Sequence, residues 1–340
     1  MKKIGLFAGA LFIAAIAFVG CKQEADEVEN ISTTSVVSEA KDAGITFNEN
    51  AKAVESVEEF NTSVLPELTS ALSGAVGNMD LTSLFSVETL KNLKANTSSF
   101  RAAITDADIE KAIADFEKQA EEFEKEMGAN KNSYDGTIDW KAPEGEYTVV
   151  DGVVITINEG SVYLNVSGEV DSGSAEAKVK ADAAADISSV INLQKAFNIK
   201  ELPYARIAVK GDVGVSGKAS GPESVDDPAD LDIDISADAY VGYSGAYIFN
   251  LEKYAGVIKM DAKVEVDADI NQALVKKYED IFKKFDASSL NKTFFDELPI
   301  DASLKISVYS IDGDEMFTLI DAESLYDIYT SISSLVPTAL

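Results

Sequence analysis

A run of carboxylates is the clearest group of side chains that could hold a metal ion. Aspartates concentrate before and along one expected strand, at Asp226, Asp227, Asp230, Asp232 and Asp234. Ca²⁺ takes about six to eight oxygen ligands in proteins, and carboxylates supply them. The spacing matches no EF-hand loop, however, and the same residues suit a solvated acidic loop and strand face. A calcium site at these five aspartates and a plain acidic surface both remain open.

Nucleophilic and acid-base catalysis have few candidate residues in this chain. It contains no histidine, which excludes Ser-His-Asp and Cys-His catalysis and His-ligated zinc or haem. Ser289 and Lys292 have the S-x-x-K spacing, but S-D-N and K-T-G motifs do not accompany it. G-x-S-x-G, Walker and G-x-G-x-x-G motifs are missing too. We expect no catalytic residues and no enzyme activity, and we keep a carboxylate-dependent carbohydrate-active enzyme as an alternative.

Aromatic residues gather near the C-terminal third of the chain. They are Tyr278, Phe282, Phe285, Phe294 and Phe295. Their large apolar rings could line the pocket of a hydrophobic ligand, or they could form the core beneath a helix.

The N-terminus has the layout of a secretory signal peptide. Lys2 and Lys3 precede an apolar run over residues 4–19, and the small Gly20 stands directly before Cys21. The run is shorter than the roughly 20 residues of a membrane span, and the acidic residues 22–30 follow it. We therefore interpret residues 1–20 as a cleaved signal.

The four residues Phe18-Val19-Gly20-Cys21 resemble the lipobox of bacterial lipoproteins, with Phe18 in place of the usual leucine. The resemblance implies that Cys21 is lipidated and becomes the first residue of the mature protein. It also implies a location in the cell envelope, and Lys22 favours the outer membrane by resemblance to enterobacterial sorting. Cys21 is the only cysteine, so a disulfide framework is impossible.

Net charge restricts the partners. The formal charge is −30, and Arg101 and Arg206 are the only arginines. Such a chain repels polyanions and lacks the guanidinium groups that read phosphates and bases, so we expect no nucleic-acid partner. Membrane attachment is expected through acyl chains on Cys21, because a polybasic patch is missing. No other cofactor than the possible calcium is expected.

Composition and periodicity divide the mature chain into three regions. Residues 21–46 are expected to form an acidic flexible tether, residues 47–130 a helical region, and residues 131–340 a sheet region, with residues 47–340 forming one folded unit. The predicted fold class is α+β. A helical region packs on a large, meander-like antiparallel sheet that has one solvated face, is crossed by two helices and is followed by a C-terminal helix.

Local patterns locate the elements. Thr105 and Asp108 predict the start of a long helix, and Asp312-Gly313 predicts a hairpin turn. Separate strands are expected at residues 147–150, 153–158 and 161–170, and apolar residues alternate with Asp and Lys along later strands. The two crossing helices are expected around residues 187–197 and 270–285, and the last helix is expected to be capped near Asp321.

Three functions follow as expectations. The first is an envelope-anchored, non-enzymatic lipoprotein with a binding, surface or scaffolding role toward an unknown protein. The second is a carrier of a lipid or other hydrophobic ligand, because small apolar residues on a curved sheet under helices could enclose a cavity. The third is the carbohydrate-active enzyme named above.

Overall fold

A large antiparallel sheet dominates the structure, which is a computed structural model. It describes residues 27–76, 103–129, 133–171, 173–222, 232–271, 292, 295 and 298–335. These residues form nine strands in one sheet together with several helices, so the predicted mixture of helices and a large antiparallel sheet is confirmed. The strands are β1 (Ser133–Lys141), β2 (Gly145–Val150), β3 (Val153–Asp171), β4 (Ser174–Asn192), β5 (Tyr204–Pro222), β6 (Asp232–Asn250), β7 (Ala255–Asn271), β8 (Ile300–Tyr309) and β9 (Glu315–Ala322). The helical segments are α2 (Thr33–Asp42), α3 (Val57–Glu59), η1 (Phe60–Val64), α4 (Leu65–Val76), α7 (Asp106–Ala129), α8 (Leu193–Phe197) and α11 (Leu325–Leu335).

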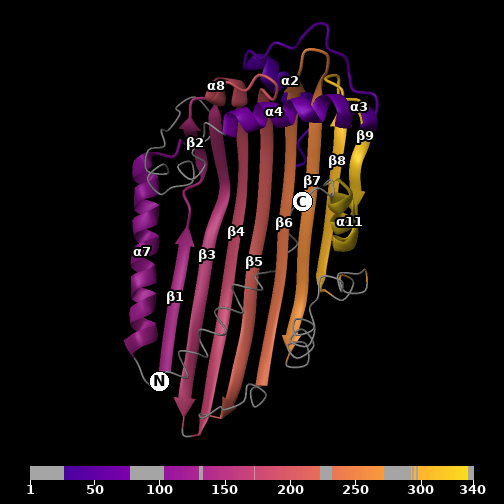
Figure 1. Cartoon of the computed structure of the whole chain (residues 1–340). Helices are drawn as coiled ribbons and strands as arrows, with labels where there is room; N and C mark the ends of the chain where they lie inside the picture. Colours follow the sequence, from indigo (N-terminus) through magenta and orange to yellow (C-terminus); the bar gives the residue numbers. More distant parts are fainter. Residues whose placement is uncertain are drawn as a thin grey trace.

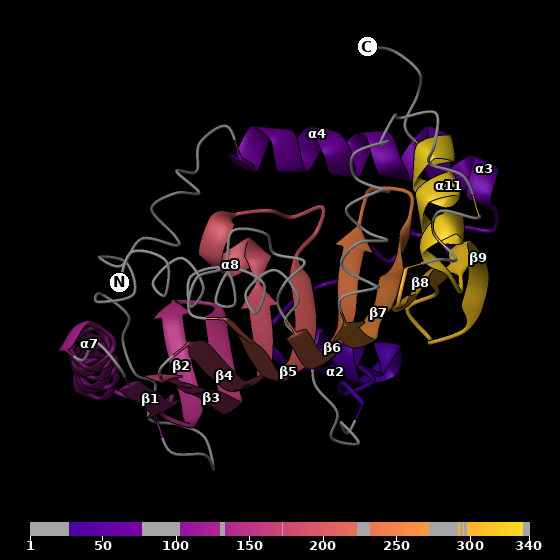
Figure 2. The same ribbon diagram turned by 90° about the horizontal axis from the view of Figure 1, so that it is seen from below.

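The sheet is a meander whose order is β1-β3-β4-β5-β6-β7-β8-β9, with β2 paired to β3. Its long central strands run nearly the full length of the molecule (Figure 1). Seen along the strands, the sheet curves, with α4 and α11 on its concave side and α2 on the other side (Figure 2). Helix α7 lies along the β1 edge (Figures 1 and 2).

The two sides of the sheet carry different residues because side chains alternate along every strand. We call the concave side the apolar face. Its central residues are Ala183, Ala185 and Ile187 of β4, Val209, Gly211 and Val213 of β5, Ala239, Val241 and Tyr243 of β6, and Ala262, Val264 and Val266 of β7. We call the other side the polar face. It carries Lys178, Lys180, Asp182, Lys210, Asp212, Lys218, Asp234, Asp238, Lys259, Asp261, Lys263 and Glu265.

Two buried clusters occupy the ends of the apolar face. At one end, Phe60, Val64 and Leu68 of η1 and α4 pack on Phe249 and Val308. We call this the α4 cluster. The far-end cluster is Val166, Ala177, Val179, Val215, Ala219, Ile235, Ala237 and Ala268, against which Phe123 and Met127 of α7 pack. Among the described residues, η1 and α4 therefore rest on one end of this face and α7 lies on its β1 edge.

The predicted flexible tether is wrong for residues 27–46. This segment contains α2, and Val36 and Ala40 are 0% exposed against Ala246 and Ile248 of β6. Sequence reasoning missed it because the acidic and polar residues hide a short apolar stripe. That stripe is buried by the sheet, more than 160 residues further along the chain.

Two predicted breaks in the sheet are also wrong. Residues 153–158 and 161–170 belong to the single strand β3, in which a register shift between Ile157 and Glu159 replaces the expected turn. The helix expected at residues 187–197 is mostly strand, because β4 continues to Asn192 in register with β5 and only α8 is helical. Ile270 lies in β7, and the rest of the helix expected at residues 270–285 lies outside the described residues.

Predictions based on capping and turn residues agree better with the structure. The Thr105 hydroxyl accepts a hydrogen bond from the Asp108 backbone N–H at 3.2 Å, as predicted for the start of α7. Gly313 has a φ of +95°, and its N–H donates to the Ser310 carbonyl at 3.1 Å, which confirms the turn. The last helix is capped by Ser324 instead of Asp321, since Asp321 lies in β9 and the Asp327 N–H donates to the Ser324 hydroxyl at 3.1 Å.

Candidate ligand-binding face

A row of small residues runs across six strands in the middle of the apolar face. Successive residues of the row are direct partners in the register of the sheet. They are Gly160, Ala185, Gly211, Val241, Val264 and Ala302. With strands about 4.8 Å apart, this row is about 24 Å long. We call it the small-residue row.

Two further rows of mostly apolar side chains lie on either side of this row. The row nearer α4 contains Ile157, Ile187, Val209, Tyr243, Ala262 and Leu304. The row nearer the far-end cluster contains Val162, Ala183, Val213, Ala239, Val266 and Ile300. The three rows together form a continuous band of apolar residues that crosses the strands, and we call it the apolar band.

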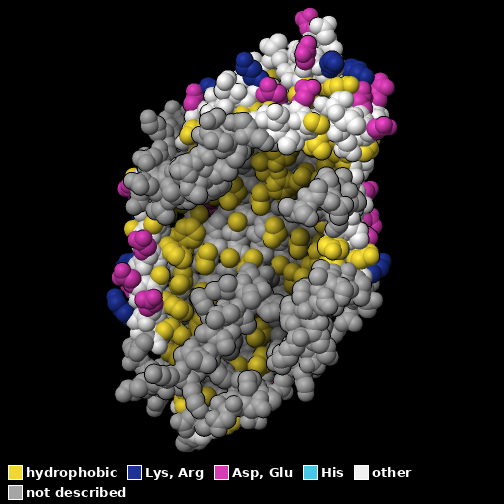
Figure 3. Space-filling view, viewed as in Figure 1, with side chains coloured by type: hydrophobic (Ala, Val, Ile, Leu, Met, Phe, Trp, Pro, Cys, Tyr) yellow, Lys and Arg dark blue, Asp and Glu magenta, His cyan; other side chains and the backbone are white. Residues whose placement is uncertain are grey.

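This central band is exposed, unlike the two ends of the same face. Val241 is 46% exposed, and Ile187, Val209 and Val264 are each 37% exposed. Figure 3 shows apolar side chains gathered at the centre of this face. Four large aliphatic side chains on one face of neighbouring strands form a contiguous apolar surface, which marks binding sites in proteins more often than a scattered single residue does. No helix among the described residues covers the centre of this face.

The apolar band carries a single polar side-chain group in its three rows, the Tyr243 hydroxyl. It is hydrogen-bonded to the Tyr247 hydroxyl, and burial together with this bond raises the pKa of Tyr243. A phenol that stays protonated and paired supplies neither a base nor a nucleophile. The arrangement can hold an alkyl chain by apolar contact, and its rows offer no group for acid-base chemistry.

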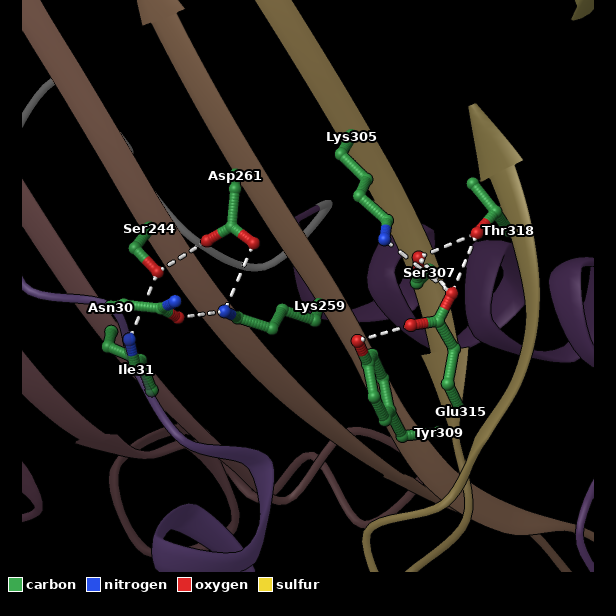
Figure 4. A network of polar contacts seen from close by, with 10 residues as sticks. All are labelled: Asn30, Ile31, Ser244, Lys259, Asp261, Lys305, Ser307, Tyr309, Glu315 and Thr318. Atoms are coloured by element: carbon green, nitrogen blue, oxygen red, sulfur yellow. Dashed lines mark hydrogen bonds and ion pairs between the residues drawn. The ribbon is translucent and has the colours of Figure 1, made fainter. Parts of the chain in front are cut away.

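A polar network on the opposite face is a second candidate site. The Ser244 hydroxyl donates to Asp261 Oδ1 at 2.7 Å, and Lys259 Nζ lies 3.0 Å from Asp261 Oδ2 (Figure 4). Ser244 is only 1% exposed, and its oxygen also accepts a hydrogen bond from the Ile31 N–H at 3.3 Å. A substrate cannot reach this hydroxyl, so the trio holds the segment before α2 in place and does not form a nucleophilic site.

The neighbouring carboxylate in Figure 4 is also engaged in structural contacts. Thr318 and Tyr309 donate hydrogen bonds to Glu315 at 2.9 Å each and thereby lower its pKa. Burial, together with Glu315, raises the pKa of Tyr309 to about 12. These groups tie the start of β9 to β8.

A small open pocket lies between α7 and β1. Its volume is about 390 Å³, and it is lined by Asp115, Lys118, Gln119, Asp139, Trp140 and Lys141. The indole N–H of Trp140 donates to the Ala112 carbonyl at 2.8 Å, and Gln119 Oε1 accepts from the Asp139 N–H at 2.7 Å. Its polar groups therefore serve the docking of α7.

Most site residues predicted from the sequence cannot be compared with the structure. Cys21 and its context Phe18, Val19 and Gly20 lie outside the described residues, as do Asp226, Asp227, Asp230, Ser289, Tyr278, Phe282, Phe285 and Phe294. Asp232 and Asp234 are exposed on the polar face, where Asp234 pairs in register with Lys218. Within the described ranges, no group of three or more His, Cys, Asp or Glu residues is arranged to hold a metal ion. Phe295 contacts Tyr326 and Tyr329 of α11, with ring centroids 5.9 and 5.5 Å apart.

The small-residue row was missed by the sequence analysis. The alternation of Ala, Gly and Val along single strands was a signal for it. The register that aligns one such residue from each of six strands was not readable from the sequence. The fold and this row define a protein with a long antiparallel sheet and a partly exposed apolar concave face.

Comparison with known proteins adds no relative. No protein-family model, curated protein sequence or solved structure matches this chain. In the part of the chain that the structure describes, none of the helices is long and apolar enough to cross a membrane.

Proposed function

We propose that this protein is a non-enzymatic lipoprotein of the bacterial cell envelope that binds the alkyl chain of a lipid on its apolar face. The observation that carries the binding role is the exposed central band, where Val241 is 46% exposed beside Ile187, Val209 and Val264. Exposed aliphatic surface of this kind is stabilised when an apolar ligand removes it from water. Ala302 is buried and Ala142 covers Gly160, so the open part of the row runs from Ala185 to Val264. At about 4.8 Å per strand this part is about 14 Å long, which suits a segment of an acyl chain lying across the strands.

The composition of the apolar band supports this ligand class. Ala185 and Gly211 carry little or no side chain, and Ile187, Val209 and Val241 around them are exposed aliphatic residues that an alkyl chain can cover. The paired Tyr243 hydroxyl offers no charge to a head group. Specificity is therefore for an apolar chain, and the head group of the ligand is recognised elsewhere or faces water.

Anchoring is proposed from the sequence. Lipidation of Cys21 gives the only cysteine a role, and Lys22 favours the outer membrane. Labelling of cells with alkyne-palmitate checks this part. Labelled protein is expected for the natural sequence and not for Cys21→Ser, and equal labelling of the two would contradict anchoring.

The binding role is tested on the mature chain, residues 22–340, with the fluorescent fatty acid cis-parinaric acid as the probe and oleate as the competitor. We expect saturable binding that oleate reverses. Val241→Asp places a carboxylate at the centre of the apolar band, where an alkyl chain would have to desolvate it, so binding should weaken at least tenfold. Val150→Asp is the matched control, because Val150 is exposed to a similar extent, 38%, but lies on β2 outside the three rows.

The outcomes separate clearly. Binding that is lost in Val241→Asp and unchanged in Val150→Asp supports the proposal. Absence of saturable binding to the natural sequence, or equal binding by the two variants, overturns it. Circular dichroism and the urea midpoint of each variant show that a loss of binding is not a loss of folding.

A further inference from the structure

Two tyrosines of β6 meet above the apolar face of the sheet. Tyr243 and Tyr247 lie four residues apart on this face, and their hydroxyls are hydrogen-bonded to each other. Gly245 lies between them, and a Cβ at that position would lie 2.5 Å from Tyr243 Oη and 2.9 Å from Tyr247 Cε2. The two side chains therefore lean over Gly245, because a residue without a side chain leaves them the space to meet.

The tyrosine pair stands between the apolar band and the α4 cluster. Tyr243 belongs to the row nearer α4 and follows the exposed Val241 by two residues on the same face. Tyr247 packs against the α4 cluster, and both tyrosines are partly exposed. Val241 and Gly245 are about 14 Å apart at roughly 3.4 Å per residue, a span that a C18 acyl chain covers. One end of an alkyl chain bound on the apolar band therefore reaches the two hydroxyls.

The pair has one hydrogen-bond donor left over. Two phenols carry two O–H protons, and the bond between them uses one. In the part of the chain that the structure describes, neither hydroxyl has another hydrogen-bond partner. A partly desolvated donor without an acceptor is unfavourable, so an acceptor that arrives with an apolar ligand stabilises the complex.

The surroundings of the pair favour an uncharged acceptor. The cross-strand neighbours of Tyr243, Gly245 and Tyr247 on β5 and β7 are Val209, Ala262, Ile207, Met260, Ala205 and Ile258. None of these six is charged. A carboxylate placed there would lose its hydration without gaining a cation, whereas an ester carbonyl is satisfied by a single donor. A fatty acid on this face would keep its carboxylate in water.

We infer that the spare O–H of the Tyr243–Tyr247 pair donates to the carbonyl oxygen of an uncharged, ester-linked acyl chain whose alkyl part lies on the apolar band. This inference rests on the proposed binding of an alkyl chain and names the ligand class as acyl esters. The contact fixes which end of the chain lies beside the α4 cluster. The carbonyl belongs to the acyl chain itself, so the head group beyond it faces water.

The inference is tested with methyl oleate and an excess of the mature chain, residues 22–340. A hydrogen bond lowers the infrared stretching frequency of an ester carbonyl, whose band is separate from the amide bands of the protein. We expect the bound ester to absorb at a lower frequency than it does in hexane. This shift should disappear in the double variant Tyr243→Phe/Tyr247→Phe, which removes both hydroxyls and keeps both rings. Tyr163→Phe is the matched control, because Tyr163 lies on the polar face of β3 beside Lys180.

Displacement of cis-parinaric acid by methyl oleate gives a second readout. The double variant should bind methyl oleate about fivefold more weakly than the natural sequence, as expected for the loss of one hydrogen bond, and Tyr163→Phe should bind it equally well. Circular dichroism and the urea midpoint of each variant check that it is folded.

The outcomes distinguish this inference from the proposed function. A lowered frequency that is lost in the double variant and kept in Tyr163→Phe supports the inference. A bound ester that absorbs at its hexane frequency, or a lowered frequency that persists in the double variant, overturns it and leaves the alkyl-binding role standing. Absence of saturable binding of cis-parinaric acid would instead contradict the proposed function, and this inference with it.

Discussion

Arg206 on β5 and Glu39 on α2 are joined by a hydrogen bond of 2.6 Å between residues 167 positions apart. The same guanidinium also holds Glu29. Arg206→Gln leaves both carboxylates without their cation, so we expect the free energy of unfolding to fall by about 1–3 kcal/mol. Amide hydrogen exchange should accelerate first in α2, before the central strands. Arg206→Lys retains the charge but not the planar guanidinium, so its free energy of unfolding should lie between those of the natural protein and of Arg206→Gln. Unchanged protection of α2 from hydrogen exchange in Arg206→Gln would contradict this role.

The hydrogen bonds to the Glu59 carboxylate should make the free energy of unfolding fall in acid. The Glu55 backbone N–H, Lys52 and Tyr254 all donate to its carboxylate and lower its pKa to about 2. Because the unfolded chain binds a proton near pH 4.5, this stabilisation is complete above that pH and is lost as the pH falls toward about 2. Glu59→Gln should therefore be less stable than the natural protein at pH 7 and converge with it near pH 2. Urea midpoints measured from pH 7 to pH 2 test this, with the neighbouring Glu58→Gln as the control for net charge.

Gly313 and Gly173 form a matched pair. Both have a positive φ, +95° and +96°, in which an alanine is strained by about 1–2 kcal/mol. An added Cβ at Gly173 meets nothing within 4 Å, whereas at Gly313 it overlaps Thr34 of α2. We expect Gly313→Ala to destabilise the protein more than Gly173→Ala, by the cost of displacing α2. Equal changes in the thermal midpoint would show that the turn does not press against α2.

Trp140 reports the docking of α7. It is the only tryptophan, and its ring stacks edge-on against Phe116 with centroids 5.7 Å apart. Phe116→Ala should shift the tryptophan emission to the red and lower the free energy of unfolding by about 0.5–1.5 kcal/mol from the lost ring pair. Phe123→Ala, which disturbs the far-end cluster on the same helix, should lower stability without the shift. An emission shift in both variants would mean that α7 detaches as one unit.

Sequence reasoning worked where a structure depends on neighbours in the chain. Thr105 and Asp108 define the start of α7 because a capping box involves residues three apart. Gly313 defines a turn because few other residues tolerate its φ. The alternation along β5 to β8 assigned apolar and charged residues to opposite faces, since side chains of a strand point alternately to its two sides.

Reasoning failed where the deciding partner is distant in the sequence. The sequence of residues 187–192 predicts a helix. Pairing of Val190 with Arg206 and of Asn192 with Tyr204 instead keeps these residues in β4. The acidic composition before residue 47 predicts a flexible tether, but contacts with Ser244, Lys259 and Arg206 hold residues 30, 31 and 39 against the sheet.

What the sequence by itself determined is the class of elements, the division of the strands into two chemically different sides, and the expectation of a lipidated Cys21. Only the tertiary structure decided which residues of neighbouring strands lie side by side on the apolar face. The small-residue row exists because the register aligns Gly160, Ala185, Gly211, Val241, Val264 and Ala302, and a shift of one residue in any strand would turn its member to the other face. Backbone hydrogen bonds between distant strands set that register, and local residue preferences do not specify it.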